Sequence, residues 1–99
     1  MSKLENDYQA YLIKKILKIF PGSIVLKNDP TYLQGIPDLS IFYKNKYAML
    51  EVKKSEFEHH QPNQDYYVDY VNNMSFAAFI FPENEDSVLN ALISFLQNQ

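Results

Sequence analysis

The 99-residue sequence contains no cysteine, no arginine and only two glycines. Without cysteine there can be neither a disulfide nor a zinc-thiolate site. The absence of cysteine suits a protein of the reducing cytoplasm. Without arginine, charged contacts to phosphate fall to lysine, a point charge that cannot recognise guanine in the bidentate way. The composition therefore argues against a protein that strongly reads DNA sequence.

Long hydrophobic runs are absent as well. Residues 1–18 carry charges throughout, so we expect no signal peptide, and nothing in the sequence is apolar for long enough to predict a transmembrane helix. The length predicts one domain, residues 1–99, with a small single core for which an oligomer is a reasonable expectation. We expect a cytoplasmic location, in a bacterium or a phage-infected host cell.

The net charge of −3 hides an uneven distribution. All nine lysines lie in residues 1–54 beside five acidic residues, whereas residues 55–99 carry seven acidic residues and no base. A basic half is the footprint expected of a protein that binds phosphate, and nucleic acid in particular. Lysines that only solvate the surface would give the same pattern.

Two predicted strands occupy the middle of the chain. Side chains alternate in character through residues 38–43 and again through 46–52, with Lys44-Asn45 as the expected two-residue turn between them. If Tyr43 faces Lys46 across this turn, the two strands form a hairpin whose register is fixed along its whole length.

That register places Asp38 opposite Glu51 on one face of the hairpin, with Cβ atoms roughly 5 Å apart. Lys53 lies on the same face, one pleat further on. Two carboxylates at this separation can bind one hard cation such as Mg²⁺, which prefers oxygen ligands. The pattern therefore predicts a metal-dependent site that cleaves phosphodiesters.

Pro37-Asp38, a spacer of twelve residues and Glu51-Val52-Lys53 resemble the signature of the PD-(D/E)XK nuclease superfamily. Within it the chain is most similar to the small stand-alone VRR-NUC nucleases of phages and bacteria, and more distantly to junction-resolving enzymes. This closer likeness is carried by residues 35–38, residues 51–54 and the glutamine-bearing segment Gln61-Pro62-Asn63-Gln64, and it extends over about residues 5–81.

The resemblance implies roles for five residues. Asp38, Glu51 and the carbonyl of Val52 would hold Mg²⁺, for which Mn²⁺ would substitute. Lys53 would orient or deprotonate the attacking water, and Gln64 would lie beside Lys53 and the attacked phosphate. Gln64 falls within the apolar stripe of a predicted helix, so a bond to nearby backbone is the alternative interpretation.

Glu5 has two interpretations. It falls near the middle of the apolar arc of a helix predicted over residues 2–20, which is formed by Leu4, Tyr8, Leu12, Ile16 and Ile19. A capping box in which Glu5 bonds to the Ser2 amide would explain the carboxylate. The resemblance implies instead that Glu5 contributes to the metal site.

Candidate DNA contacts are Lys54, Gln34 and Lys14. Lys54 follows the motif, Gln34 lies in the loop over residues 28–35 that leads to Asp38, and Lys14 lies on the polar side of the first helix, where it could equally be only solvated. His59-His60 lacks the spacing of a metal-binding pair, so we assign it no metal.

The remaining elements complete an α/β fold. We expect a strand over residues 23–27 beside the hairpin, a helix over 62–73, a strand over 76–81 and a final helix after residue 87. The apolar run 76–81 predicts a strand inside the sheet. The resemblance implies a restriction-endonuclease-like core, a mixed central sheet flanked by helices in the order α-β-β-β-α-β-α.

The resulting functional hypothesis is a structure-selective DNA endonuclease that resolves four-way (Holliday) junctions or other branched DNA as a homodimer. The aromatic content of 15% exceeds what so small a core readily buries. We therefore expect a self-complementary interface that includes the Tyr66-Tyr67-Tyr70 helix or the Phe57 loop. The alternatives are a non-catalytic binding module of the same fold and a restriction-type nuclease acting on duplex DNA.

Overall fold

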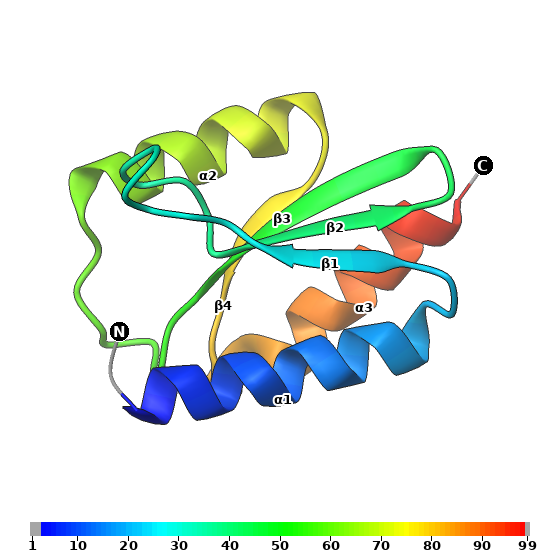
Figure 1. Ribbon diagram of the computed structural model, residues 1–99, viewed down its shortest axis with the longest axis horizontal. Helices are drawn as coiled ribbons and strands as arrows, with labels where there is room; N and C mark the ends of the chain where they lie inside the picture. Colours follow the sequence, from blue (N-terminus) through cyan, green and yellow to red (C-terminus); the bar gives the residue numbers. More distant parts are fainter. Residues whose placement is uncertain (1–2, 99) are drawn as a thin grey trace.

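The chain folds in the predicted order of helix, three strands, helix, strand and helix (Figure 1). Residues 3–98 are described by the computed structural model, so Ser2, and with it the predicted capping box, lies outside the described residues. The elements are α1 (Lys3–Ile19), β1 (Ile24–Lys27), β2 (Leu39–Tyr43), β3 (Lys46–Val52), α2 (Pro62–Met74), β4 (Ala77–Ile80), the 3₁₀ turn η1 (Pro82–Asn84) and α3 (Glu85–Gln97).

The four strands form one mixed sheet in the order β1-β2-β3-β4. β1, β2 and β3 are antiparallel neighbours, and β4 runs parallel to β3. Tyr43 pairs with Lys46 across the turn, which confirms the predicted two-residue hairpin loop. Lys44 takes a φ of 57° within it, the left-handed conformation that tight hairpin turns commonly require.

The predicted internal position of strand 76–81 is wrong, because β4 pairs with β3 alone and lies at an edge. Its residues are nevertheless apolar toward both faces. Ala77 packs with Val68 and Val71 of α2, whereas Ile80 belongs to the main core on the other face. Helices on both sides, rather than flanking strands, explain the continuous apolar run.

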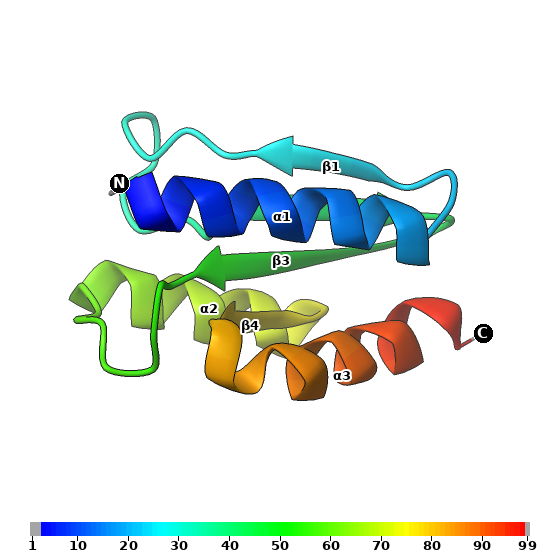
Figure 2. The same cartoon turned by 90° about the horizontal axis from the view of Figure 1, so that it is seen from below.

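The two faces of the sheet are covered unequally. Helices α1 and α3 lie together on one face, and α2 lies on the other (Figures 1 and 2). The main core between the sheet and the α1–α3 layer includes Leu12, Ile16, Phe20, Leu39, Ile41, Leu50, Ile80, Leu92 and Leu96. The α2 face has a smaller cluster built from Val68, Val71 and Ala77 with Tyr47, Met49 and Phe79 packed against it.

The buried side of α1 begins later than its periodicity indicates. Leu4 is exposed, Tyr8 is half-buried, and the fully buried apolar positions are Leu12 and Ile16, followed by Phe20 directly after the helix. The first turn of α1 therefore reaches beyond the core, which leaves its inner side chains free to approach the end of the sheet. No helix within residues 3–98 has the combined length and apolarity needed to cross a membrane.

Candidate active site

The hairpin register brings Asp38 and Glu51 together. Leu39 pairs with Leu50, so Asp38, one residue before β2, stands opposite Glu51 near the end of β3. The Asp38 Oδ2 atom accepts a hydrogen bond of 2.9 Å from the backbone N–H of Val52. This bond holds the Asp38 carboxylate against β3, the strand that carries Glu51.

Lys53 and Gln64 complete a network around Glu51. The Lys53 Nζ atom donates to Gln64 Oε1 at 2.8 Å and to the His59 carbonyl at 3.1 Å, and Gln64 Nε2 donates to Glu51 Oε2 at 2.8 Å. Lys53 Nζ also lies 3.8 Å from Glu51 Oε2. The side-chain amide of Gln64 therefore fixes the ammonium and the carboxylate relative to each other.

Gln64 contacts both nearby backbone and Lys53. Its Oε1 atom accepts the backbone N–H of Gln61 at 3.0 Å, a capping contact at the start of α2, while the same atom receives Lys53. The first turn of α2 thus serves as the support on which the position of Lys53 depends.

Glu51 is buried with one oxygen unsatisfied. Glu51 and Lys53 are each 3% exposed, and Glu51 Oε1 has no hydrogen-bond partner among residues 3–98. Burial, and then repulsion by Asp38, raise the pKa of Glu51 to about 8. Burial also raises the pKa of Asp38, against the lowering effects of the Val52 N–H and of Lys53.

A divalent cation fits this pair on electrostatic grounds. A buried carboxylate oxygen without a partner is costly, and two facing carboxylates repel when both are ionised. A cation bound by Asp38 and Glu51 would remove both costs, and oxygen ligands are those that Mg²⁺ prefers. Within the described part of the chain, no three His, Asp or Glu side chains are gathered as a metal-binding group.

Glu58 also lies at the site, although no sequence pattern indicated it. It lies in the loop between β3 and α2, where its Oε1 atom accepts the Lys54 N–H at 2.7 Å and its Oε2 atom lies 3.8 Å from Lys53 Nζ. Burial opposes ionisation of Glu58, but hydrogen bonds with Glu5 and the Lys54 amide outweigh it and lower its pKa. An irregular loop has no periodicity from which this contact could have been inferred.

Glu5 faces the same group of charges. Burial comes first among the causes that raise the pKa of Glu5 to about 7, followed by a hydrogen bond with Glu58 and repulsion by it; Asp38 adds to the rise and Lys53 opposes it. The first-turn acid of α1 therefore belongs to the electrostatic environment of the Asp38–Glu51 pair.

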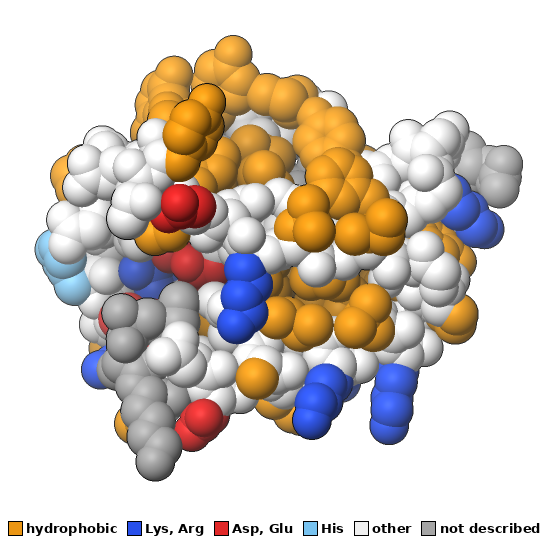
Figure 3. Space-filling view, viewed as in Figure 1, with side chains coloured by type: hydrophobic (Ala, Val, Ile, Leu, Met, Phe, Trp, Pro, Cys, Tyr) orange, Lys and Arg blue, Asp and Glu red, His pale blue; other side chains and the backbone are white. Residues whose placement is uncertain are grey.

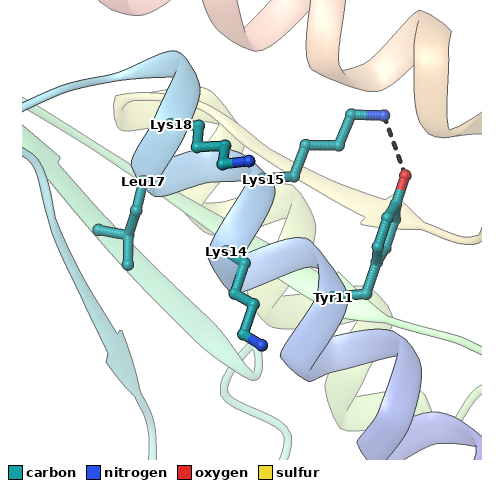
Figure 4. A pocket seen from close by; sticks show the side chains of 5 residues that line it. All are labelled: Tyr11, Lys14, Lys15, Leu17 and Lys18. Carbon is teal, nitrogen blue, oxygen red and sulfur yellow. Dashed lines mark hydrogen bonds between the residues drawn. The ribbon is translucent and has the colours of Figure 1, made fainter.

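The three candidate DNA contacts lie in different places. Lys54 is exposed and lines a depression of about 410 Å³ with Leu4, Tyr8, Ser55 and Pro82. Gln34 is exposed in the loop before Asp38. Lys14 lies apart from the carboxylates, in a depression of about 640 Å³ on the exposed side of α1 formed with Tyr11, Lys15, Leu17 and Lys18 (Figure 4).

Gly35 anchors the loop that leads to Asp38. Its φ is +90°, and a Cβ atom added there would lie 2.3 Å from Asn63 Cβ. Both the positive φ and the close approach of Asn63 require glycine at this position. The contact joins the loop before β2 to the first turn of α2, one residue from Gln64.

The paired histidines have other partners. The His60 ring stacks on Phe79 with centroids 4.0 Å apart, and its Nδ1 atom lies 3.1 Å from Asp65 Oδ1. His59 contributes its backbone carbonyl to Lys53.

Comparison with known proteins supplies no assignment. No protein-family model matches the chain, and no match was found among curated proteins or among solved structures. The function therefore has to be inferred from the geometry of the site itself.

Proposed function

We propose that the chain is a metal-dependent DNA endonuclease of the PD-(D/E)XK type. The observation that carries the proposal is the buried Glu51 carboxylate facing Asp38, whose Oε1 atom has no hydrogen-bond partner among residues 3–98, with Lys53 held in the same network by Gln64. A carboxylate pair that is unstable without a cation, next to a fixed ammonium, suits hydrolysis of an anionic phosphodiester.

In this proposal Asp38 and Glu51 hold the ion, with Glu5 and the Val52 carbonyl as further ligands. The bond from the Val52 N–H to Asp38 keeps the Val52 backbone beside the carboxylates. When bound, Mg²⁺ would supply Lewis-acid stabilisation of charge on the phosphoryl and leaving oxygens and a more acidic water, and Mn²⁺ would substitute.

Lys53 acts on the substrate side of the carboxylates. Its ammonium group, fixed by Gln64 and the His59 carbonyl, would orient the attacking water or stabilise negative charge on a phosphate oxygen. Preorganisation of this kind needs no rearrangement at the moment of reaction. The expected products carry a 5′ phosphate and a 3′ hydroxyl.

The fold is compatible with a restriction-endonuclease-like core. The α-β-β-β-α-β-α order, the antiparallel hairpin carrying both carboxylates and the parallel fourth strand support that assignment. The glutamine at the third position of α2 is a further shared feature of the resemblance.

The substrate in this proposal is branched DNA, with a four-way junction as the first candidate. The chain has no arginine for bidentate contacts to guanine, so shape is a better basis for selection than base sequence. A lysine-based surface would bind phosphate without regard to the base.

A cleavage panel tests the proposal. Junction, flap, splayed-arm and linear duplex DNA are incubated with Mg²⁺, Mn²⁺, Ca²⁺ or EDTA, using the wild type, Lys53→Ala and the control Lys44→Ala in the exposed hairpin turn. We expect cleavage of branched DNA with Mg²⁺ or Mn²⁺ only, lost in Lys53→Ala and kept in Lys44→Ala. Binding of a junction without cleavage in any metal would contradict the proposal and favour a non-catalytic module, and cleavage of linear duplex alone would favour the restriction-type alternative.

A further inference from the structure

The α2 face of the sheet has one helix where the other face has two. α2 packs on β3 and β4, whereas no helix in residues 3–98 covers β1 and β2 on this side (Figure 1). The side chains of β1 and β2 that point to this face include Ile24, Leu26 and Phe42, and all three are exposed. Half of one sheet face is therefore apolar and uncovered.

A second exposed apolar surface lies on α2 itself, formed by Tyr66, Tyr70 and Met74. These residues recur every four positions, so they form one stripe along the helix. The rings of Tyr66 and Tyr70 are 5.8 Å apart. This α2 stripe is separate from the positions Val68 and Val71 that bury against the molecule's own sheet.

Two contacts show that the α2 stripe faces β1 and β2. Asp65 contacts His60, which stacks on Phe79 of β4, so the Asp65 side of α2 points toward the β4 edge. The stripe is roughly 140° around the helix from Asp65, at 100° per residue. Asn63, on the stripe side, meets Gly35 in the loop that connects β1 to β2.

The uncovered strands and the α2 stripe thus form the floor and wall of one apolar groove. Figure 3 shows hydrophobic side chains gathered around a hollow between α2 and the strands. The six groove residues, Ile24, Leu26, Phe42, Tyr66, Tyr70 and Met74, are 44–58% exposed. With the surface typical of large side chains, they present roughly 600 Å².

We propose that a second copy of this chain fills the groove, with the partner's α2 lying beside α2 and over the uncovered half of the sheet. The surface is self-complementary, because the α2 stripe of each copy can pack on the uncovered half of the sheet in the other copy. The exposed area approaches the roughly 800 Å² per partner of a standard interface. The six residues are uncharged, so two copies bring no like charges together there.

The floor of the groove extends along the sheet toward the candidate active site. Ile24 pairs with Phe42, which pairs with Tyr47, at the turn end of the hairpin. Asp38 and Glu51 lie at the opposite end of the same strands. The part of the groove formed by Ile24 and Phe42 is therefore remote from the site, whereas Leu26, which pairs with Ser40, lies nearer to it.

Light scattering of the full chain at micromolar concentration tests the interface. We expect about twice the chain mass of 11.6 kDa for the wild type, and the monomer mass for Tyr70→Glu and Phe42→Glu, which change one wall and one floor residue. Phe57→Glu is the matched control, because Phe57 is 86% exposed outside the groove, and it should remain a dimer. A monomeric wild type, or a dimer lost only in Phe57→Glu, would overturn the proposal.

Cross-linking gives a second readout that does not depend on how the glutamate variants fold. Because the chain has no cysteine, Phe42→Cys and Tyr70→Cys chains can be mixed and treated with a short bis-maleimide. We expect a cross-link between the two different chains, and its absence in a sample that scatters as a dimer would overturn the interface. Dimerisation without nuclease activity would contradict only the proposed function, and cleavage by a monomer would contradict only the interface.

Discussion

Glu51 is the residue whose surroundings most constrain what the site can do. One of its oxygens accepts a hydrogen bond from Gln64, and the other has no hydrogen-bond partner within the described part of the chain, in a position that is almost fully buried. Asp38 faces it, and Lys53 offsets only part of the combined negative charge. The site is therefore less stable when both acids are ionised and no cation is present.

This arrangement predicts a pH-dependent stability in EDTA. The pKa of Glu51 is raised from 4.5 to about 8 on folding, so the stability it contributes is complete below pH 4.5 and is lost as the pH rises to 8. The raised pKa values of Glu5 and Asp38 act in the same direction. Thermal unfolding should show Glu51→Gln to be more stable than the wild type at pH 8.5, by on the order of a few kcal/mol, and little different at pH 4.5.

The control for this experiment is Glu56→Gln, an exposed acid in the neighbouring loop. It should follow the wild-type pH profile. If Glu51→Gln also followed the wild-type profile, Glu51 would not be a carboxylate destabilised by burial and by Asp38.

Lys53→Ala separates catalysis from metal binding. The ammonium group lies 3.8 Å from Glu51 Oε2, beyond hydrogen-bond distance, and donates instead to Gln64 Oε1 at 2.8 Å. We expect the single-turnover rate to fall by about 100-fold or more, with little change in the Mn²⁺ concentration that gives half-maximal rate. An equal loss of rate and metal affinity would assign Lys53 to the structure of the metal site instead.

At the scale of elements, the site depends on how the loop over residues 28–37 packs against α2. Gly35 and Gly22 both have a φ of +90°, but only Gly35 lies against another segment, the first turn of α2. Gly35→Ala would push this loop away from Asn63 and disturb Gln64, one residue further along. Gly22→Ala adds the same backbone strain with no atom within 4 Å.

We therefore expect the two glycine variants to differ in stability and in cleavage activity. Both should lower the melting temperature by strain, but Gly35→Ala should lose more stability and most cleavage activity, whereas Gly22→Ala should keep its activity per folded molecule. Equal activity in the two variants would show that the contact with Asn63 does not support the site.

Helices α1 and α3 are joined by a polar contact centred on Glu85. Its carboxylate accepts the hydroxyls of Tyr8 at 2.9 Å and Tyr11 at 3.0 Å and pairs with Lys15 at 2.7 Å. Burial opposes ionisation of Glu85, but these hydrogen bonds outweigh it and lower its pKa. Glu85→Ala should destabilise the protein by about 2 kcal/mol in urea unfolding, and Glu83→Ala on the exposed turn should not. Equal midpoints would show that the contact adds nothing.

Local patterns predicted the hairpin, but not the contacts made by loops. Period-two alternation and a two-residue turn were sufficient to place Asp38 opposite Glu51, because a hairpin turn fixes the register of both strands. Glu58 could not be placed, since its position depends on how an irregular segment folds back on Lys53 and Lys54. The edge position of β4 could not be predicted either. A strand covered by helices on both faces has the same continuous apolar run as a strand inside a sheet.

For the whole molecule, the basic and acidic halves of the sequence are packed together rather than kept apart. Lys15 pairs with Glu85, and Lys46 Nζ donates to the backbone carbonyls of Phe95 and Asn98 in the acidic half. Lys14 and Lys18 lie on the exposed side of α1 (Figure 4), whereas Lys53 is buried at the site. Uneven charge along a sequence therefore does not by itself define a DNA-binding face.

The most direct test of the nuclease proposal is cleavage of a labelled four-way junction in Mg²⁺ by the wild type, Glu51→Gln and the control Glu83→Gln. Glu51→Gln keeps the shape of the side chain but removes the charge that would hold the ion. We expect the wild type and Glu83→Gln to release products with a 5′ phosphate, and Glu51→Gln to be at least 1,000-fold slower, as on the order of 4 kcal/mol of lost transition-state stabilisation would give. Cleavage by Glu51→Gln at the wild-type rate, or no metal-dependent cleavage by the wild type, would contradict the assignment of this carboxylate pair as a nuclease metal site.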